Sequence, residues 1–357
     1  MDSNYYVTTP AEVIVNKCAQ LYAQYGYRRF MMNKFEDYAL YAENKSFLVD
    51  DRLLTFTDGS KLKALKPDIT LSIVKNLAKD DHLPLKVFYD EAVYRVKKGE
   101  KEFSELRQMG LELIGDDSTY ATCEVICLAK ASLDAINEHN ILDISHMMIL
   151  LPLIDRACAC GIDRADLVSL ITQKNADGIR SLFAKYSCNN PLADLVASYA
   201  PLHQMIPVLQ QLFPESLAVH ELAEIAEVLA VQGLSDNVYL DFSLLHNIGY
   251  YNGVVFKGYI KDVPVAVLSG GRYDPLLERF GRQDAALGFA IYLDYIRYHR
   301  TAQETDVLLI YDQTDPAVSV ARAMSVLTDQ GYSVLAAASA PADRSFSKTV
   351  KVKEVLS

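Results

Sequence analysis

The segment from Gln108 to Gly115 constrains the fold more than any other part of this 357-residue chain. Every second residue in it is apolar, so that one face carries Met109, Leu111 and Leu113 and the other carries Gln108, Gly110 and Glu112. A period of two is the pattern of a β-strand. We therefore expect one face of this strand to pack in a core while the other face is able to hold a ligand.

Segments with other periodicities lie on both sides of this strand. The patterns predict helices over 11–25, 69–77 and 119–138, and strands over 85–96, 237–242 and 250–260. Residues 51–62 are expected to form a strand and a turn, with the turn at Asp58-Gly59-Ser60. Val263–Leu268 is expected to pair with the strand before it after a turn at Lys261-Asp262, and Leu287–Ile296 to resume as a strand or the start of a helix. Residues 140–235 look helical throughout.

The chain changes character near Thr301. A strand over 307–311, a helix over 316–330 with Asp315 as its N-cap, and a strand over 332–336 are expected to form a small βαβ unit. With 50% hydrophobic residues, the chain has ample material for one large domain and a smaller one. We therefore predict a core over residues 1–300, with a helical insertion at about 140–235, and a small C-terminal α/β domain over 301–357.

Composition argues against several classes of protein. The longest apolar run, Met147–Ile154, contains Pro152 and is far shorter than the ~20 residues of a membrane span. The N-terminus lacks the pattern of a secretory signal, so we expect a cytoplasmic location and no membrane contact. The net charge of -11 argues against tRNA as the main partner, because nucleic-acid binders need a basic surface.

The six cysteines are scattered, and Cys158 and Cys160 have no second pair or nearby histidine at the spacing of a zinc site. Cys123 and Cys127, four residues apart on an expected helix, fit one buried helical face better than a metal site. We expect reduced thiols, no metal and no cofactor.

Four separated segments resemble the histidyl-tRNA synthetase branch of the class II synthetases. They are Leu65–Thr70, then Val93–Arg95 with Arg107–Glu112, then Tyr250–Gly253, and finally Gly270–Asp274 with Leu287–Ala290. Their order and spacing make chance agreement improbable. The resemblance implies an α+β fold in which an antiparallel sheet is flanked by helices.

The same resemblance implies a pocket for histidine. Asp68, Thr70 and Gln108 match the family's contacts to the α-ammonium group, whereas Glu112 and Tyr251 match the contacts to the two imidazole nitrogens. The pocket is completed by positions that match the family's motif 2 arginine and its pocket lining, namely Arg95, Tyr250, Tyr273 and Gly288. Taken singly, tyrosines on a strand are usually packing residues and Glu112 could be a solvated acid. As a matched set, these residues favour ligand binding.

The resemblance fails where the family holds ATP. Val96-Lys97 replaces an acid that helps to hold adenine, and the two expected arginines fall at His246 and at Tyr295, with Arg297 shifted by two residues. A proline of motif 1 falls at Asn33. Because a single oxyanion donor is worth about 3 to 4 kcal/mol, we expect the loss of two cations to abolish useful adenylation.

The sequence retains the residues that contact the amino acid and lacks those that contact the nucleotide. In this it resembles the ATP phosphoribosyltransferase regulatory subunits, which are paralogues of histidyl-tRNA synthetase. That resemblance implies no catalytic residue, a short-form catalytic subunit as partner, histidine as feedback effector of the first step of histidine biosynthesis, and a homodimer within a hetero-oligomer. Two alternatives stay open. One is an active ligase that activates an amino acid with ATP, and the other is a stand-alone regulator that binds histidine or RNA.

Overall fold

The computed structural model describes residues 10–44, 48, 52–77, 83–96, 102–245, 249–296, 305–341 and 345–356. The chain divides into two compact units, a larger one from Ala11 to Arg297 and a smaller one that includes the C-terminal residues from Tyr298. Within the described ranges, no helix is long and apolar enough to cross a bilayer.

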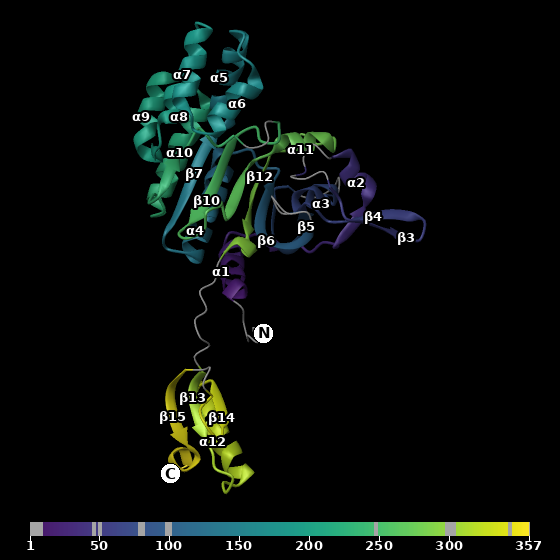
Figure 1. Ribbon diagram of the computed structural model, residues 1–357, viewed down its shortest axis with the longest axis vertical. Helices are drawn as coiled ribbons and strands as arrows, with labels where there is room; N and C mark the ends of the chain where they lie inside the picture. Colours follow the sequence, from purple (N-terminus) through teal and green to yellow (C-terminus); the bar gives the residue numbers. More distant parts are fainter. Residues whose placement is uncertain are drawn as a thin grey trace. The chain divides into compact units, whose positions relative to one another are not determined.

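A nine-stranded sheet forms the centre of the larger unit (Figure 1). In spatial order its strands are β1 (Arg28–Arg29), β5 (Leu85–Val96), β6 (Phe103–Ile114), β12 (Ala286–Tyr292), β11 (Leu268–Arg272), β10 (Val254–Ile260), β7 (Asn140–His146), β9 (Val238–Leu240) and β8 (Ala200–Pro201). Neighbouring strands run antiparallel except β1 with β5 and β7 with β9. This largely antiparallel sheet, flanked by helices, agrees with the predicted α+β class.

Different helices pack on the two faces of the sheet. On one face, α1 (Pro10–Gln24) and α4 (Thr119–Ile136) join through a 2.8 Å hydrogen bond between Tyr22 and Ser132, and the Tyr22 ring packs edge-on against Phe88 and Phe289. On the other face, α2 (Tyr38–Glu43), α3 (Ile69–Lys75) and α11 (Asp274–Arg279) share one apolar cluster with residues of β5. The open space for a ligand lies on this second side.

The alternation predicted for residues 108–115 is confirmed by β6. Met109, Leu111 and Leu113 are at most 1% exposed, whereas Gln108 and Glu112 on the opposite face border a cavity. The helices expected over 11–25, 69–77 and 119–138 are also confirmed, and so is the strand over 85–96.

The prediction that residues 140–235 are helical throughout was wrong at its start. Residues 140–146 form β7, which pairs with β10 and β9 and is the third strand from the β8 edge of the sheet. Its apolar residues, Leu142 and Ile144, alternate with Asp143 and Ser145, but the run is short and leads directly into a helix. The insertion that follows contains α5 (Met147–Ala159), α6 (Arg164–Thr172), α7 (Ala176–Lys185), α8 (Leu192–Ala197), α9 (Leu202–Leu212) and α10 (Leu217–Val231).

The predicted hairpin has the right partners but wrong limits. Its second strand is Leu268–Arg272 rather than 263–268, and its first strand begins at Val254 rather than Tyr250. Gly270 lies within this second strand. A Cβ at this position would lie 2.3 Å from the carbonyl oxygen of Gly288 on β12. Glycine here permits close approach of two strands.

Two shorter features complete the larger unit. The strand and turn predicted within 51–62 are confirmed by β3 (Thr55–Asp58) and the turn at residues 59–60. The turn leads into β4 (Lys61–Leu65), and both strands form a separate three-stranded sheet with β2 (Phe35–Asp37). A short 3-10 helix, Leu293–Tyr295, follows β12.

The smaller unit contains the predicted βαβ arrangement in β13 (Thr305–Ile310), α12 (Ala317–Asp329) and β14 (Val334–Ala337). A third parallel strand, β15 (Phe346–Lys351), and α13 (Val352–Leu356) were not predicted. Asp315 does not cap α12 as expected, since its carboxylate accepts from the backbone N–H of Asp312 and the residue before the helix is Pro316.

Candidate functional site

A cavity of about 280 Å³ opens on the ligand-facing side of β6. Its lining comes from α3, β5, β6, β11 and β12 and from the segments that join them. All nine residues predicted to bind histidine line it: Asp68, Thr70, Arg95, Gln108, Glu112, Tyr250, Tyr251, Tyr273 and Gly288. The structure thus brings together positions that are up to 220 residues apart in the chain.

Glu112 lies at the bottom of the cavity and is only 2% exposed. Thr70 donates to its Oε1 at 3.0 Å and Tyr273 donates to its Oε2 at 2.7 Å. Burial raises the pKa of Glu112 to about 8, and the hydrogen bonds from Tyr273 and Thr70 oppose this rise. Glu112 is therefore an oriented buried acid and not a solvated one.

Asp68 holds the start of α3 as well as facing the cavity. Its Oδ1 accepts from the backbone N–H of Leu71 at 2.9 Å, which makes it the N-cap of the helix. Burial raises the pKa of Asp68, although the charge of Arg95 and the backbone amides of Leu71 and Thr70 work in the opposite direction. One carboxylate oxygen is thus committed to the helix, a role that the sequence did not reveal.

Arg95 supplies the positive charge of the cavity. Its Nε atom is buried and makes no hydrogen bond to the described protein atoms. A buried guanidinium N–H without an acceptor is costly. Arg95 therefore lines the cavity with a buried donor that the described protein atoms do not satisfy.

Gly288 provides the space in which Glu112 lies. A Cβ at this position would come within 1.7 Å of Glu112 Oε2 and 2.4 Å of the carbonyl oxygen of Leu111. Any side chain here would displace the acid, so a glycine is required.

Three tyrosines form one wall of the cavity. The ring of Tyr250 lies 4.7 Å from that of Tyr251, nearly perpendicular to it, and 5.9 Å from that of Tyr273. Because these rings also pack against the apolar cluster of α3 and α11, they are packing and lining residues at once.

Several lining residues were not predicted as site residues. Tyr292 shares a hydrogen bond with Ser269, and Arg107 makes two 2.8 Å bonds with the carboxylate of Asp90. Their proximity follows from the pairing of strands, which no local pattern reports. Tyr295, expected where the family has an arginine, also lines the cavity. His246, Lys97 and Arg297 lie outside the described residues.

The arrangement has a clear chemical character. Asp68, Glu112 and Arg95 line a small space whose remaining lining combines tyrosines with aliphatic and polar side chains, which suits a zwitterion with a polar ring. The other charged lining residues, Arg107 and Asp294, already bond to protein groups. In the part of the chain that the structure describes, no group of three or more histidine, cysteine, aspartate or glutamate side chains could hold a metal ion.

Comparisons with known proteins agree with this picture. A family model for histidyl-tRNA synthetase matches residues 8–296. The chain is 28% identical over 299 residues to the ATP phosphoribosyltransferase regulatory subunit of Alkaliphilus metalliredigens, over 80% of this chain and 75% of that protein. With the regulatory subunit of Desulfitobacterium hafniense it shares 30% identity over 271 residues, 72% of this chain and 70% of that protein.

A solved structure extends the likeness beyond the sequence. A protein from Bacillus halodurans, described as an ATP phosphoribosyltransferase regulatory subunit/histidyl-tRNA synthetase, matches with a TM-score of 0.74 and 25% identity, over 98% of this chain and 97% of that one. The synthetase-like fold predicted from the sequence is thereby confirmed. The chain belongs to the histidyl-tRNA synthetase family and, within it, to the ATP phosphoribosyltransferase regulatory subunits.

Proposed function

We propose that this chain is the non-catalytic regulatory subunit of an ATP phosphoribosyltransferase, and that it reports the level of histidine to a short-form catalytic subunit. The transferase chemistry belongs to the partner chain, which carries out the first step of histidine biosynthesis. The shared name of the relatives supports this role, and the site supports histidine as the effector.

The observation that carries the proposal is the charge pattern of the cavity. Asp68 and Thr70, assisted by Gln108, face the α-ammonium group of histidine, and the unpartnered Nε of Arg95 faces its carboxylate. Glu112 accepts the imidazole N–H, and Tyr251 donates to the other ring nitrogen. The ammonium group of the ligand favours the ionised form of Asp68, because opposite charges at close range stabilise each other. The imidazole N–H favours the ionised form of Glu112, because a hydrogen bond to a charged group stabilises it.

The size of the cavity supports an amino acid rather than an amino acid together with ATP. Its volume of about 280 Å³ lies at the lower limit of small-molecule pockets, which range over roughly 300–1,000 Å³. A regulatory pocket needs room only for its effector.

The cations of the cavity also support a sensor. Amino-acid activation by ATP develops negative charge on phosphate oxygens, which fixed cations must stabilise. Arg107 is held by Asp90, and Tyr295 lies where the family has an arginine. Among the described lining residues, Arg95 is then the cation that we assign to the ligand. The carboxylate group of one histidine molecule is sufficient to pair with it.

Control of the partner requires only a modest coupling energy. Histidine bound in the cavity shifts a two-state equilibrium at the interface with the catalytic subunit, and a coupling of about 1 to 3 kcal/mol shifts that equilibrium about 5- to 150-fold.

The chain forms a homodimer within this hetero-oligomer, and tRNA is not a ligand. Apolar side chains exposed on the three-stranded sheet, with Phe35, Phe56 and Leu62 at 43%, 38% and 46% exposed, support contact with a second copy. The net charge of -11 supports the absence of tRNA binding.

Two measurements on the purified chain test the proposal. Isothermal titration should detect selective binding of histidine, and histidine-dependent exchange between ATP and pyrophosphate should be absent. An active ligase, the rival function, predicts rapid exchange and binding of ATP. Co-expression with the catalytic subunit separates a third case, because a stand-alone regulator would not co-purify with it.

A further inference from the structure

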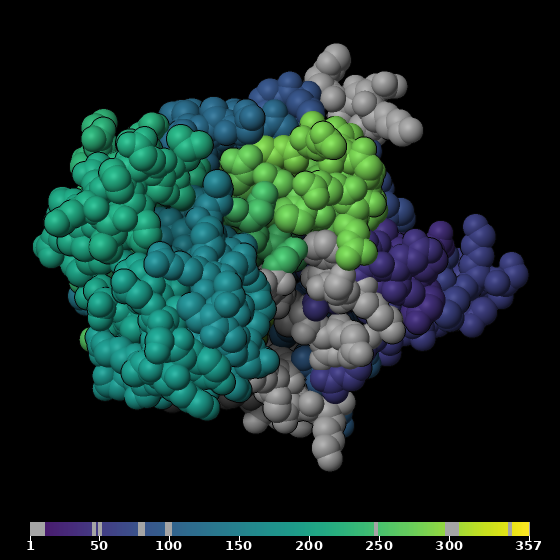
Figure 2. All heavy atoms as spheres, turned by 90° about the horizontal axis from the view of Figure 1, so that it is seen from above, coloured from purple at the N-terminus to yellow at the C-terminus, as the bar shows by residue number. Residues whose placement is uncertain are grey.

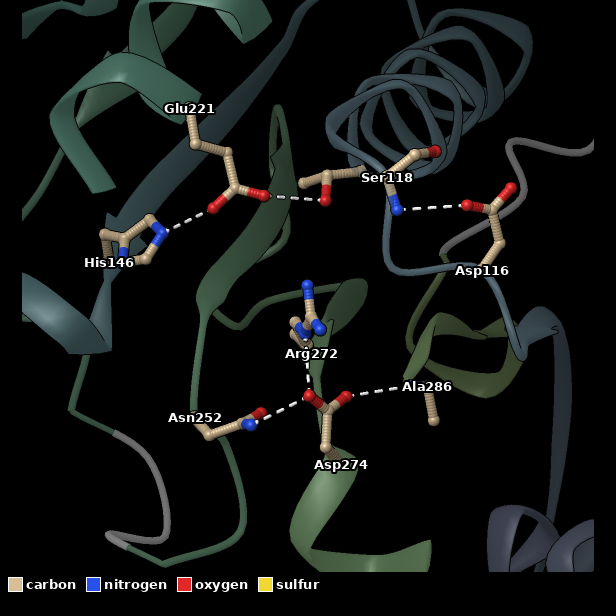
Figure 3. Close-up of polar contacts among 9 residues, drawn as sticks. Asp116, Ser118, His146, Glu221, Asn252, Arg272, Asp274 and Ala286 are labelled. Carbon is tan, nitrogen blue, oxygen red and sulfur yellow. Dashed lines mark hydrogen bonds and ion pairs between the residues drawn. The ribbon is translucent and has the colours of Figure 1, made fainter. Parts of the chain in front are cut away.

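Asp274 lies outside the cavity and joins three segments of the chain through its two carboxylate oxygens (Figure 3). Oδ1 accepts from the backbone N–H of Ala286 at 2.8 Å. Oδ2 accepts from Nδ2 of Asn252 at 2.9 Å and from Nε of Arg272 at 2.8 Å. These four residues are called the Asp274 cluster below.

Each of the three donors stands beside a residue of the cavity wall. Asn252 follows Tyr251, Arg272 precedes Tyr273, and Ala286 lies two residues before Gly288. Two backbone hydrogen bonds reinforce the cluster, from Asn252 N–H to the carbonyl of Arg272 at 3.0 Å and from Tyr273 N–H to the carbonyl of Ala286 at 2.8 Å. One carboxylate thus fixes the spacing of all three wall segments.

The carboxylate of Asp274 matters for these wall segments because not all of their residues lie within the strands of the sheet. Tyr251 lies three residues before the start of β10, and Tyr273 follows the last residue of β11. Tyr273 in turn orients Glu112 through its hydroxyl group. A small shift of these segments therefore moves the groups that face the ligand.

The charge of Asp274 also decides where Arg272 points. The charge of Arg272 also stabilises the ionised form of a second acid, Glu221 of α10 in the helical insertion. Glu221 accepts from Thr122 and bonds to Nε2 of His146. Figure 3 shows the outer end of the guanidinium turned away from Asp274 towards the side where Glu221 lies. In Figure 2 the teal atoms of the helical insertion lie beside the light-green atoms of the later part of the larger unit. Without the charge of Asp274, Glu221 is the acid that competes for Arg272.

We propose that Asp274 is a positioning residue for the amino-acid pocket, which holds Tyr251, Tyr273 and Gly288 at the spacing that binding requires. This inference rests on the proposed function, since the ligand is taken to be histidine. Asp274 itself touches no ligand and acts through its neighbours.

The test compares Asp274→Asn with a matched control in the intact chain. An asparagine offers one acceptor oxygen where three donors converge, and it removes the charge that holds Arg272. Asp134→Asn is the control, because Asp134 also accepts from two side chains, Lys130 and Asn140, but lies away from the cavity. Asn252→Ala removes one of the three hydrogen bonds to Asp274. This variant replaces Asp274→Asn in the test if Asp274→Asn does not fold.

Hydrogen–deuterium exchange without ligand and titration with histidine are the two readouts. We expect Asp274→Asn to raise amide exchange in 250–253, 270–274 and 285–289 and to weaken histidine binding about tenfold, as expected for lost hydrogen bonds to a charged group. Asn252→Ala should weaken binding by a smaller factor, and Asp134→Asn should leave both the exchange of these segments and the affinity unchanged.

Three outcomes would decide against the inference or its basis. Unchanged exchange in the wall segments would overturn the positioning role. Raised exchange with unchanged affinity would reduce Asp274 to a purely structural residue, which also overturns it. If the unaltered chain binds no histidine, the proposed function fails, whereas the exchange readout still decides whether Asp274 fixes the cavity wall.

Discussion

The hydroxyl group of Tyr273 donates to Oε2 of Glu112 at 2.7 Å across 161 positions of the chain. Since Thr70 donates to the other oxygen, the acid is held from both sides. A carboxylate has about four lone-pair sites, so it is able to accept a further hydrogen bond from a ligand. The buried glutamate is thus preorganised for an N–H group and is the centre of the site.

Replacing this acid should impair binding more than folding. In Glu112→Gln one oxygen becomes an NH₂ group, which faces a donor instead of accepting from it. We expect histidine affinity to fall about 10- to 100-fold, because hydrogen bonds to charged groups are worth about 1.5–3 kcal/mol. Isothermal titration calorimetry measures the affinity of the variant for histidine. Glu105→Gln, at an exposed position of the same strand, is the control and should bind normally; equal affinities for the two variants would contradict the assignment.

The raised pKa of Glu112 predicts a dependence of stability on pH. The pKa is about 8 in the folded chain against a usual 4.5, so between these values the folded state holds a proton that the unfolded state has lost. The free energy of unfolding should therefore decrease as the pH rises from 4.5 to 8, by up to roughly 1.4 kcal/mol per pH unit from this group. Above pH 8 this contribution no longer changes.

Urea denaturation at pH 5, 6, 7 and 8 isolates that contribution when the original chain is compared with Glu112→Gln. The glutamine variant lacks the titrating group, so the difference in free energy of unfolding between the two chains should grow in favour of the variant as the pH rises. Parallel pH profiles for both chains would show that Glu112 ionises normally.

A methyl group at position 288 should abolish binding. In Gly288→Ala the new Cβ would lie 1.7 Å from Glu112 Oε2, so the acid must leave its donors. We expect loss of measurable histidine binding together with destabilisation of about 1–3 kcal/mol from overpacking. Gly258→Ala is the matched control, because its Cβ would meet only the flexible end of Leu133 and the side chain of Leu268, outside the cavity. Normal binding by Gly288→Ala would contradict the described geometry.

The helical insertion should depend on His146 for stability. This fully buried residue accepts from Met148 N–H through Nδ1, caps α5, and bonds through Nε2 to Glu221 at 2.8 Å. Because Nδ1 accepts, the neutral ring carries its proton on Nε2 and donates to the glutamate. His146→Ala leaves both partners unsatisfied and should cost about 2–4 kcal/mol in urea denaturation. The exposed His139→Ala should cost little, and similar losses in both variants would argue against this role.

Much of the site could be predicted because four separated segments resemble the histidyl-tRNA synthetase family, and that resemblance implied nine of the residues that line the cavity. The alternation around Leu111 predicted which face of β6 would hold Glu112, whereas the close approach of strands at Gly270 was not predicted. β7 was missed because its alternation spans few residues before α5 begins. The N-cap role of Asp68 and the bonds of Asp274 depend on tertiary neighbours, which no periodicity encodes.

The most direct test of the account is a reconstituted assay of the short-form ATP phosphoribosyltransferase catalytic subunit. The account predicts that its activity requires this chain, that histidine inhibits the complex, and that Glu112→Gln in this chain weakens the inhibition while activation is retained. Activity that is indifferent to this chain would contradict the regulatory role. Inhibition by histidine that is unchanged in the variant would place the effector site elsewhere.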